Sequence, residues 1–260
     1  MDILTYSLNN FERFMFVFLR VLGILFIAPI FGHRSLFSQA KIGLALVVAI
    51  ALFPVVPSSL APYPHVISLA IAVAKELMMG LMIGFVSLLV FMGVQFAGQM
   101  VGLDIGFGVA NIVDPLSAEQ VSIVGEFQTL LATVIFLMIN GHHMLLRALA
   151  ASYEMVPLGR VNLSPLLGDK LLSMSGKVFV IGVQLAAPIS ATLFLTTLAL
   201  GIVARTIPQM NVFVVGFPLK IVVGIAMLMF TLPIFYATLV KLFGSMESDL
   251  STLLRLMGGA

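Results

Sequence analysis

Residues 77–103 read LMMGLMIGFVSLLVFMGVQFAGQMVGL, a run of 27 residues without one charged side chain. An α-helix needs about 20 apolar residues to cross the hydrocarbon core of a bilayer, so this run is long enough to do so. Other uncharged runs lie on both sides of it, at residues 42–74, 178–204 and 221–240, with shorter ones at 21–33, 127–141 and 206–219. The pattern predicts a membrane protein built from several such segments.

The composition of the 260-residue chain supports the same prediction. It is 61% hydrophobic and 9% charged, against roughly 25% charged residues in ordinary soluble domains. Backbone groups cannot stay unpaired in lipid, so the runs form helices or a closed barrel, and none shows the alternation typical of barrel strands. We therefore expect an all-α integral membrane protein of about six apolar helices, broken by proline and glycine and arranged as helical hairpins.

The composition and the motifs exclude or disfavour several function classes. The absence of cysteine excludes disulfides and thiolate metal sites, and a net charge of +2 gives no basis for nucleic-acid binding. GFGVAN at residues 106–111 lacks the third glycine and the preceding strand of a dinucleotide site. His142 and His143 point in different directions on a helix and are interpreted as a polar helix end. We expect no catalytic residue, no cofactor and no metal.

Charges and prolines inside the apolar runs indicate helices covered by protein as well as lipid. Arg20 lies in the middle of the first run, where an ionisable group is costly. The favoured interpretation is that it binds carbonyls or pairs with an acid in a neighbouring helix, and a role in transport is the alternative. Breaks that free backbone polar groups are expected at six prolines: Pro29, Pro54, Pro188, Pro208, Pro218 and Pro233.

The segment that follows the opening run, GQMVGLDIGFGVANIVDPLSAEQ at residues 98–120, is unusual in this chain. Gly98, Gly102 and Gly106 recur every four positions and leave a smooth helical stripe for close packing, either within the chain or against another subunit. Residues 105–116 then read as an apolar loop, which needs burial or obstructs something. We expect one membrane domain over 1–260, with helices at 1–104, this loop, helices at 117–241 and an amphipathic tail at 242–260.

Three stretches together resemble one family, the FliR family of flagellar export-gate proteins and their virulence-system counterparts. The most specific is RTIPQMNVFVVGFPLK at residues 205–220, joined by GFGVANIVDP at 106–115 and by the placing of Arg20, Pro29, Arg34, Lys41 and Pro54. Family members often have a proline where Phe37 stands, and some carry aromatic side chains where Val109 and Ile112 stand, so any seal formed at these two positions would be aliphatic.

The resemblance implies a non-enzymatic subunit of the type III secretion export gate. It implies assembly with FliP-like and FliQ-like subunits and FlhB, contact with membrane lipid, and passage of unfolded flagellar export substrates through the centre. It places the chain in the bacterial inner membrane at the flagellar basal body. A secondary transporter of ions or small solutes is the alternative function.

Two sets of residues take roles from this resemblance. The first would form a plug that excludes water from the conduit; we call it the gate segment, and it comprises Ile105, Gly106, Phe107, Gly108, Val109, Ala110, Asn111, Ile112, Val113, Asp114 and Pro115. The second is expected at subunit contacts and comprises Gly98, Gly102, Arg20, Arg205, Pro208, Gln209, Asn211, Phe213, Gly216 and Pro218. Asp104 would pair with a partner chain or face a wet vestibule.

Overall fold

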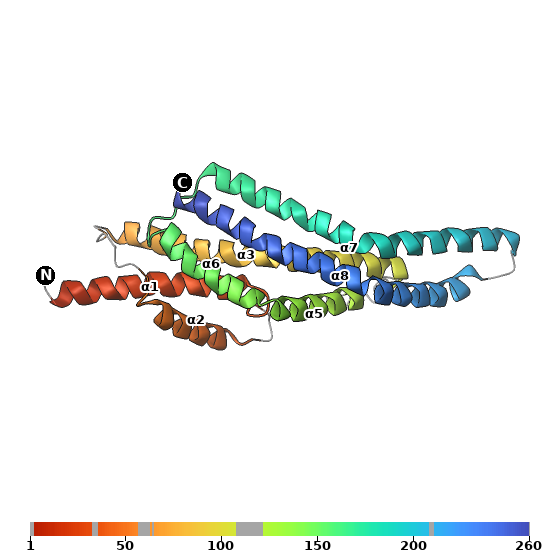
Figure 1. Ribbon diagram of the computed structural model, residues 1–260, viewed down its shortest axis with the longest axis horizontal. Coiled ribbons are helices and arrows are strands. Elements are labelled where there is room, and N and C mark those ends of the chain that lie inside the picture. The colour runs from red at the N-terminus through yellow and green to blue at the C-terminus, as the bar shows by residue number, and fades with distance from the viewer. Residues whose placement is uncertain are drawn as a thin grey trace. The chain divides into compact units, whose positions relative to one another are not determined.

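The computed structural model describes residues 3–32, 36–56, 63, 65–107, 122–207 and 211–259. All regular structure in these ranges is helical (Figure 1), which confirms the expected all-α fold. The helices are α1 (Ile3–Ile27), α2 (Ser38–Leu52), α3 (Val66–Ile105), α5 (Ile123–Met138), α6 (Gly141–Met155), α7 (Pro165–Thr206) and α8 (Val212–Gly258).

Three of the described helices are long and apolar enough to cross a membrane. They are α3, α7 and α8, whose 40, 42 and 47 residues exceed the roughly 20 that span a bilayer. A fourth candidate is the pair α5 and α6, which is bent by 63°. The bend falls at Asn140, whose φ of 59° is left-handed and stops the helix before Gly141 begins the next one.

The prolines affect the helices in two different ways. Pro29 and Pro54 follow the ends of α1 and α2, as expected from the missing backbone donor. In contrast, α7 runs through Pro188 and α8 runs through Pro218 and Pro233. The predicted interruptions at these three positions are therefore wrong. A proline inside a helix removes one backbone hydrogen bond and can bend the helix, but the turns on either side still hold it together.

The chain divides into two compact units, and the first comprises residues 1–89, 137–175 and 243–260. In this unit α1 crosses the first half of α3 at glycines, because a Cβ on Gly23 would lie 2.6 Å from the Leu77 carbonyl oxygen and one on Gly84 3.0 Å from that of Ile24. A Cβ on Gly80 would overlap the Arg20 carbonyl oxygen. Figure 1 shows α1 beside this part of α3. The glycine spacing here serves backbone contact within the chain.

Basic side chains hold α2 against its surroundings in the first unit. Arg13 of α1 donates to the Phe53 carbonyl at 2.9 Å and also to the Val56 carbonyl, both at the C-terminal end of α2. Lys41 in the first turn of α2 donates to the Gly32 carbonyl at 3.0 Å. These bonds satisfy carbonyls that helix and turn ends leave without partners, so α2 is attached at both ends.

The last part of α8 also belongs to the first unit. Its apolar residues at 246, 250, 253, 254 and 257 are all buried, and the backbone N–H of Asn162 donates to the Met257 carbonyl at 2.9 Å. The sequence predicts an amphipathic tail here that lies on the membrane or on a partner. The amphipathic pattern is present, but its apolar face packs on this chain and the segment continues α8 without a break.

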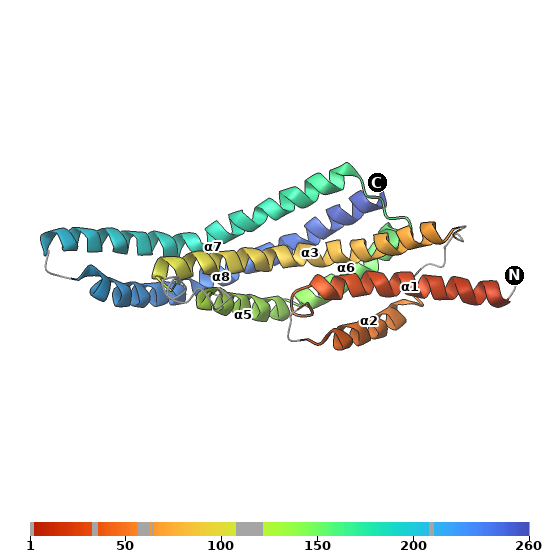
Figure 2. The ribbon, with the colours of Figure 1, turned by 180° about the vertical axis from the view of Figure 1, so that it is seen from behind.

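The second unit comprises residues 90–136 and 176–242. Figure 2 shows the parts of α7 and α8 that belong to it running side by side. The end of α3 approaches α7 closely, because a Cβ on Gly93 would lie 2.6 Å from a side-chain carbon of Ile181. Phe91 of α3 and Phe136 of α5 meet edge to face with ring centroids 5.7 Å apart. Small residues and interlocked rings therefore set the packing of this unit.

Candidate gate segment and its supporting contacts

The gate segment begins at a well-defined helix end. The N–H of Phe107 donates to the Gly102 carbonyl at 3.0 Å and that of Gly106 to the Leu103 carbonyl at 3.1 Å. This pair of bonds is the Schellman motif, which closes a helix with a left-handed residue and satisfies its last carbonyls. The point at which the chain leaves α3 is therefore fixed by backbone hydrogen bonds.

Gly106 has to be glycine for two separate reasons. Its φ is +107°, a conformation that residues with a Cβ rarely adopt. A Cβ added there would also lie 2.8 Å from Cε1 of Phe217, a residue of α8. The ring of Phe217 thus closes over the first glycine of the gate segment.

The structure places only three of the gate residues. Ile105 is fully buried and packs on α8, where a Cβ on Gly224 would lie 2.6 Å from Cγ1 of Ile105. Ile105 therefore belongs to a helix contact, Gly106 to the helix end, and Phe107 is half-buried beyond it. The plug role stays a prediction for the whole segment. The remaining gate residues, Gly108, Val109, Ala110, Asn111, Ile112, Val113, Asp114 and Pro115, lie outside the described residues.

Gly98 and Gly102 lie against α5 of the same chain. A Cβ on Gly98 would overlap Cα of Gly125, and one on Gly102 would overlap Oγ of Ser122. Ser122 caps α5 by accepting from the Gly125 N–H at 3.2 Å, and its hydroxyl donates to the Gly98 carbonyl at 3.0 Å. This contact corresponds to the internal-packing alternative for the two glycines. A role of Gly98 and Gly102 at a subunit contact stays a prediction.

The signature at residues 205–220 forms the connection from α7 to α8. Arg205 is exposed in the last turn of α7, where its positive charge interacts favourably with the negative end of the helix dipole. Asn211 caps α8, since its Oδ1 accepts from the Val214 N–H at 3.4 Å. Gly216 is buried and faces Leu200 of α7, and Pro218 is exposed.

The rest of this signature is not placed in the same detail. Pro208 and Gln209 lie outside the described residues, and so does the side chain of Phe213, whose backbone is in the first turn of α8. A role of the signature at subunit contacts stays a prediction.

Arg20 is the centre of a buried charge cluster in the first unit, which consists of Arg20, Glu76, Ser152, Val156 and Gly159. Arg20 and Glu76 are both fully buried, and Nε of Arg20 lies 2.7 Å from Oε2 of Glu76. The guanidinium also donates to the Ser152 carbonyl and hydroxyl, each at 3.0 Å, and to the Val156 carbonyl at 3.2 Å. The second oxygen of Glu76 accepts from the Gly159 N–H at 2.7 Å.

The cluster ties together segments that are remote in the sequence. Arg20 comes from α1, Glu76 from α3 and Ser152 from α6, and the guanidinium lies over the Tyr153 ring, 4.5 Å from its centroid. Sequence reasoning anticipated an acid for Arg20 but did not identify it as Glu76, which follows Lys75 between two apolar runs. The contacts that the structure gives Arg20 are all within this chain, which corresponds to the favoured interpretation of Arg20. Its expected place at a subunit contact stays a prediction.

Tyr63 borders this cluster. Its ring meets Phe16 edge to face with centroids 5.8 Å apart, and its hydroxyl touches Gly159, where a Cβ would overlap it. Burial raises the pKa of the Tyr63 phenol above its usual value, and the negative charge of Glu76 adds to this rise. Tyr63 is therefore neutral and serves as a packing partner.

Asp104 precedes the gate segment and is exposed. It forms no ion pair with another residue in the part of the chain that the structure describes. Both alternatives for this acid, a partner chain and a wet vestibule, require such exposure, so the choice between them stays open.

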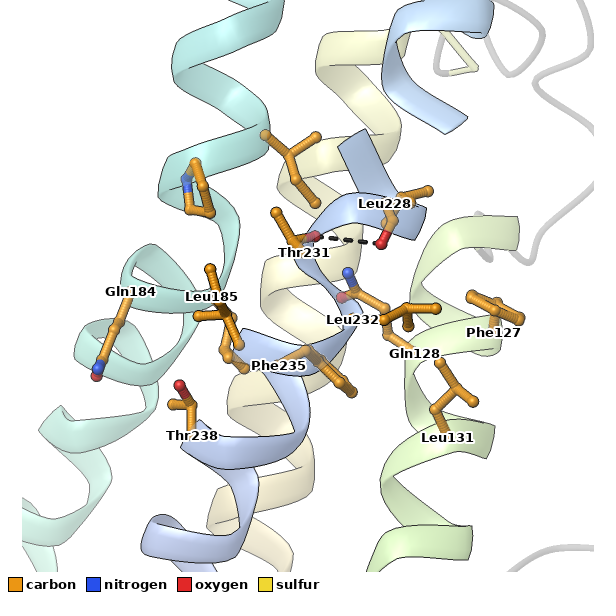
Figure 3. Close-up of a pocket in the computed structure, with 13 residues that line it drawn as sticks. Phe127, Gln128, Leu131, Gln184, Leu185, Leu228, Thr231, Leu232, Phe235 and Thr238 are labelled. Carbon is orange, nitrogen blue, oxygen red and sulfur yellow. Dashed lines mark hydrogen bonds between the residues drawn. The ribbon is translucent and has the colours of Figure 1, made fainter. Parts of the chain in front are cut away.

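A small pocket in the second unit lies between α5, α7 and α8 (Figure 3) and has a volume of about 30 Å³. Gln128 lines it, is 3% exposed, and its Oε1 has no hydrogen-bond partner in the described residues. Thr231, also at the pocket, donates to the carbonyls of Met227 and Leu228. A cavity needs only about 10–15 Å³ to hold one water molecule. The pocket therefore accommodates water and is too small for a substrate or a cofactor.

These features define a class: an all-α integral membrane protein whose helices meet at glycines and around a buried ion pair. Residues 11–246 match the family described as bacterial export proteins, family 1, and the chain belongs to this family. It is 34% identical over 258 residues to the flagellar biosynthetic protein FliR of Bacillus subtilis, with 96% of this chain and 98% of that protein covered. The identity to FliR of Escherichia coli K12 is 33% over 216 residues, 83% of this chain and 82% of that protein. The family resemblance seen in the sequence is confirmed.

Proposed function

We propose that this chain is a subunit of the flagellar type III protein export gate and that it helps form and seal the conduit for unfolded flagellar subunits. The observation that carries the proposal is the family match over residues 11–246, together with relatives named as flagellar biosynthetic proteins that align over nearly the whole chain. These relatives lend no support to the alternative of a solute transporter. A role in export and assembly, without catalysis, is the function that they favour.

The surface of the second unit supports assembly with partner chains. In the most apolar stretch of α8, only 17% is buried within the chain. Phe230, for example, is 75% exposed. Apolar surface of this extent is covered either by lipid or by other apolar helices. FliP-like and FliQ-like subunits and FlhB are the proposed partners, and the inner membrane at the flagellar basal body is the proposed location.

The end of α3 supports a sealing role for the gate segment. The Schellman motif and the Phe217 ring hold the first residues of the segment in a fixed place, and the residues that follow in the sequence are mainly small and apolar. A constriction of apolar side chains can stop ions because water withdraws from it. Because the end of α3 is held in place, the start of such a constriction would keep a constant position.

Deleting residues 107–112 tests the sealing role. We expect the assembled gate to conduct ions more strongly than the unmodified gate, measured in planar bilayers, while the partner subunits still co-purify with the tagged chain. A matched control replaces Val66 and Ile67, two exposed apolar residues at the far end of α3, by serine and should leave the conductance unchanged. A deletion variant that assembles and conducts no more than the unmodified gate would count against the plug.

The partners are tested separately by affinity purification from membranes of cells that produce the tagged chain. Recovery of FliP-like and FliQ-like chains in a fixed ratio is the expected result. A chain that purifies by itself as a single stable species, and that moves a solute when reconstituted alone, would overturn the export-gate proposal in favour of a transporter.

A further inference from the structure

A cavity of about 100 Å³ lies inside the first unit between α1, α2 and α6. Apolar side chains from all three helices line it, among them Ile24, Leu44, Val48 and Leu149, and His142 is the one polar residue of the lining. Apolar spaces of this kind hold water poorly and take up apolar groups instead. The volume suits a few carbons of a hydrocarbon chain.

His142 gives this cavity a polar edge. Its Nδ1 is buried and has no hydrogen-bond partner in the described residues. A buried polar atom without a partner is costly and uncommon in native structures. An oxygen-bearing group at the mouth of the cavity would provide the missing hydrogen bond.

An open hollow lies next to the cavity on the surface of α6, and Leu146 lines both. Asn140, His143 and Arg147 also line this hollow, and His143 and Arg147 are four residues apart, so they share one helix face. Both are exposed, and in the described residues neither lies within ion-pair distance of a carboxylate. The hollow therefore presents a guanidinium without a counter-charge.

From these features we infer that α6 carries a binding site for one anionic glycerophospholipid. The order of the groups along the site matches the order of groups along such a lipid. The phosphate would lie in the hollow at Arg147 and His143, an ester oxygen would accept a hydrogen bond from Nδ1–H of His142, and the start of one acyl chain would fill the cavity under α2. The helix α6 forms a bent pair with α5 that is a candidate membrane span, so a lipid of this kind is at hand. Basic pockets between membrane helices bind such headgroups.

The test uses the full chain, purified by a tag in a mild detergent with any subunits that stay bound, and titrated with phosphatidylglycerol while lipid adducts are counted by native mass spectrometry. We expect saturable binding of one phosphatidylglycerol in preference to phosphatidylcholine. The Arg147→Gln variant should bind it about fivefold more weakly, because a basic residue near a lipid surface contributes about that factor. The Arg160→Gln variant changes an exposed arginine outside the hollow and serves as its control.

A second pair of variants tests the acyl-chain part of the site. Val48→Phe would fill the cavity and should lower lipid binding, whereas Val47→Phe, on the 62% exposed neighbour that faces outward, should not. Equal binding by Arg147→Gln and Arg160→Gln, or by the two phenylalanine variants, would overturn the inference. Displacement of the bound lipid by millimolar inorganic phosphate would also overturn it, because it would show that the hollow holds a free anion.

Discussion

Replacing Arg20 by methionine should be among the most damaging single substitutions in this chain. The change leaves Glu76, which is fully buried, with the Gly159 N–H as its one remaining hydrogen bond among the described residues. It also removes the donors bonded to Ser152 and Val156. Breaking a buried ion pair from one side costs about 3–5 kcal/mol, a large share of the 5–15 kcal/mol that holds a typical domain together.

The expected loss can be measured as a shift in thermal unfolding of the purified chain, followed by circular dichroism in detergent. For a chain of this size 1 kcal/mol corresponds to about 2–4 °C, so the midpoint should fall by about 6–20 °C. The exposed Arg255, replaced in the same way, is the control and should shift the midpoint by less than about 2 °C.

The double variant Arg20→Met, Glu76→Met separates the charge from the packing. Apolar side chains of similar volume often replace a buried ion pair without loss, so the double variant should recover most of the stability that the single variant loses. Two results would refute the reasoning: a single variant as stable as the unmodified chain, or a double variant no more stable than the single one.

Three further substitutions have expected outcomes. Gly106→Ala should lower the free energy of unfolding by at least about 1 kcal/mol and reduce swimming motility, because Gly106 has a φ of +107° and lies against the ring of Phe217. Gly43→Ala, at an open position of α2, is the control and should change neither the unfolding free energy nor the motility. Gly98→Leu should abolish accumulation of the chain in membranes, since a side chain there meets the α5 backbone, and normal immunoblot levels would contradict this. Asp249→Asn, which removes a 3.6 Å pair with Lys170, should change the unfolding free energy by less than about 1 kcal/mol, because this pair is partly exposed; a larger effect in the same melting experiment would contradict this.

The sequence suffices for the fold class because lipid allows few solutions. Runs such as residues 77–103 have to be helical once they enter a bilayer, and nothing in them alternates as barrel strands do. The helix stop at Gly106 could also be anticipated from glycine followed by an apolar segment. The passage of α7 through Pro188 could not, because whether a proline ends a helix or only bends it depends on the packing around it.

The pairing within the buried charge cluster was beyond sequence reasoning for a geometric reason. Glu76 lies 56 positions from Arg20 and Ser152 lies 132 positions from it, and no local pattern links residues so far apart. Periodicity shows that Gly98 and Gly102 share a helix face, but it does not say which helix they meet. The structure answers that question with α5 of the same chain.

The apolar stretch of α8 that this chain leaves largely exposed has a consequence for the amount of this protein in a cell. In the proposed assembly, a copy made in excess of its partners keeps an apolar helix surface that no other protein covers, and cellular proteases and chaperones remove proteins that are not properly folded or assembled. Surplus copies would be degraded while assembled ones persist. The supply of neighbouring subunits, more than the rate of synthesis, would then set how many copies each cell retains.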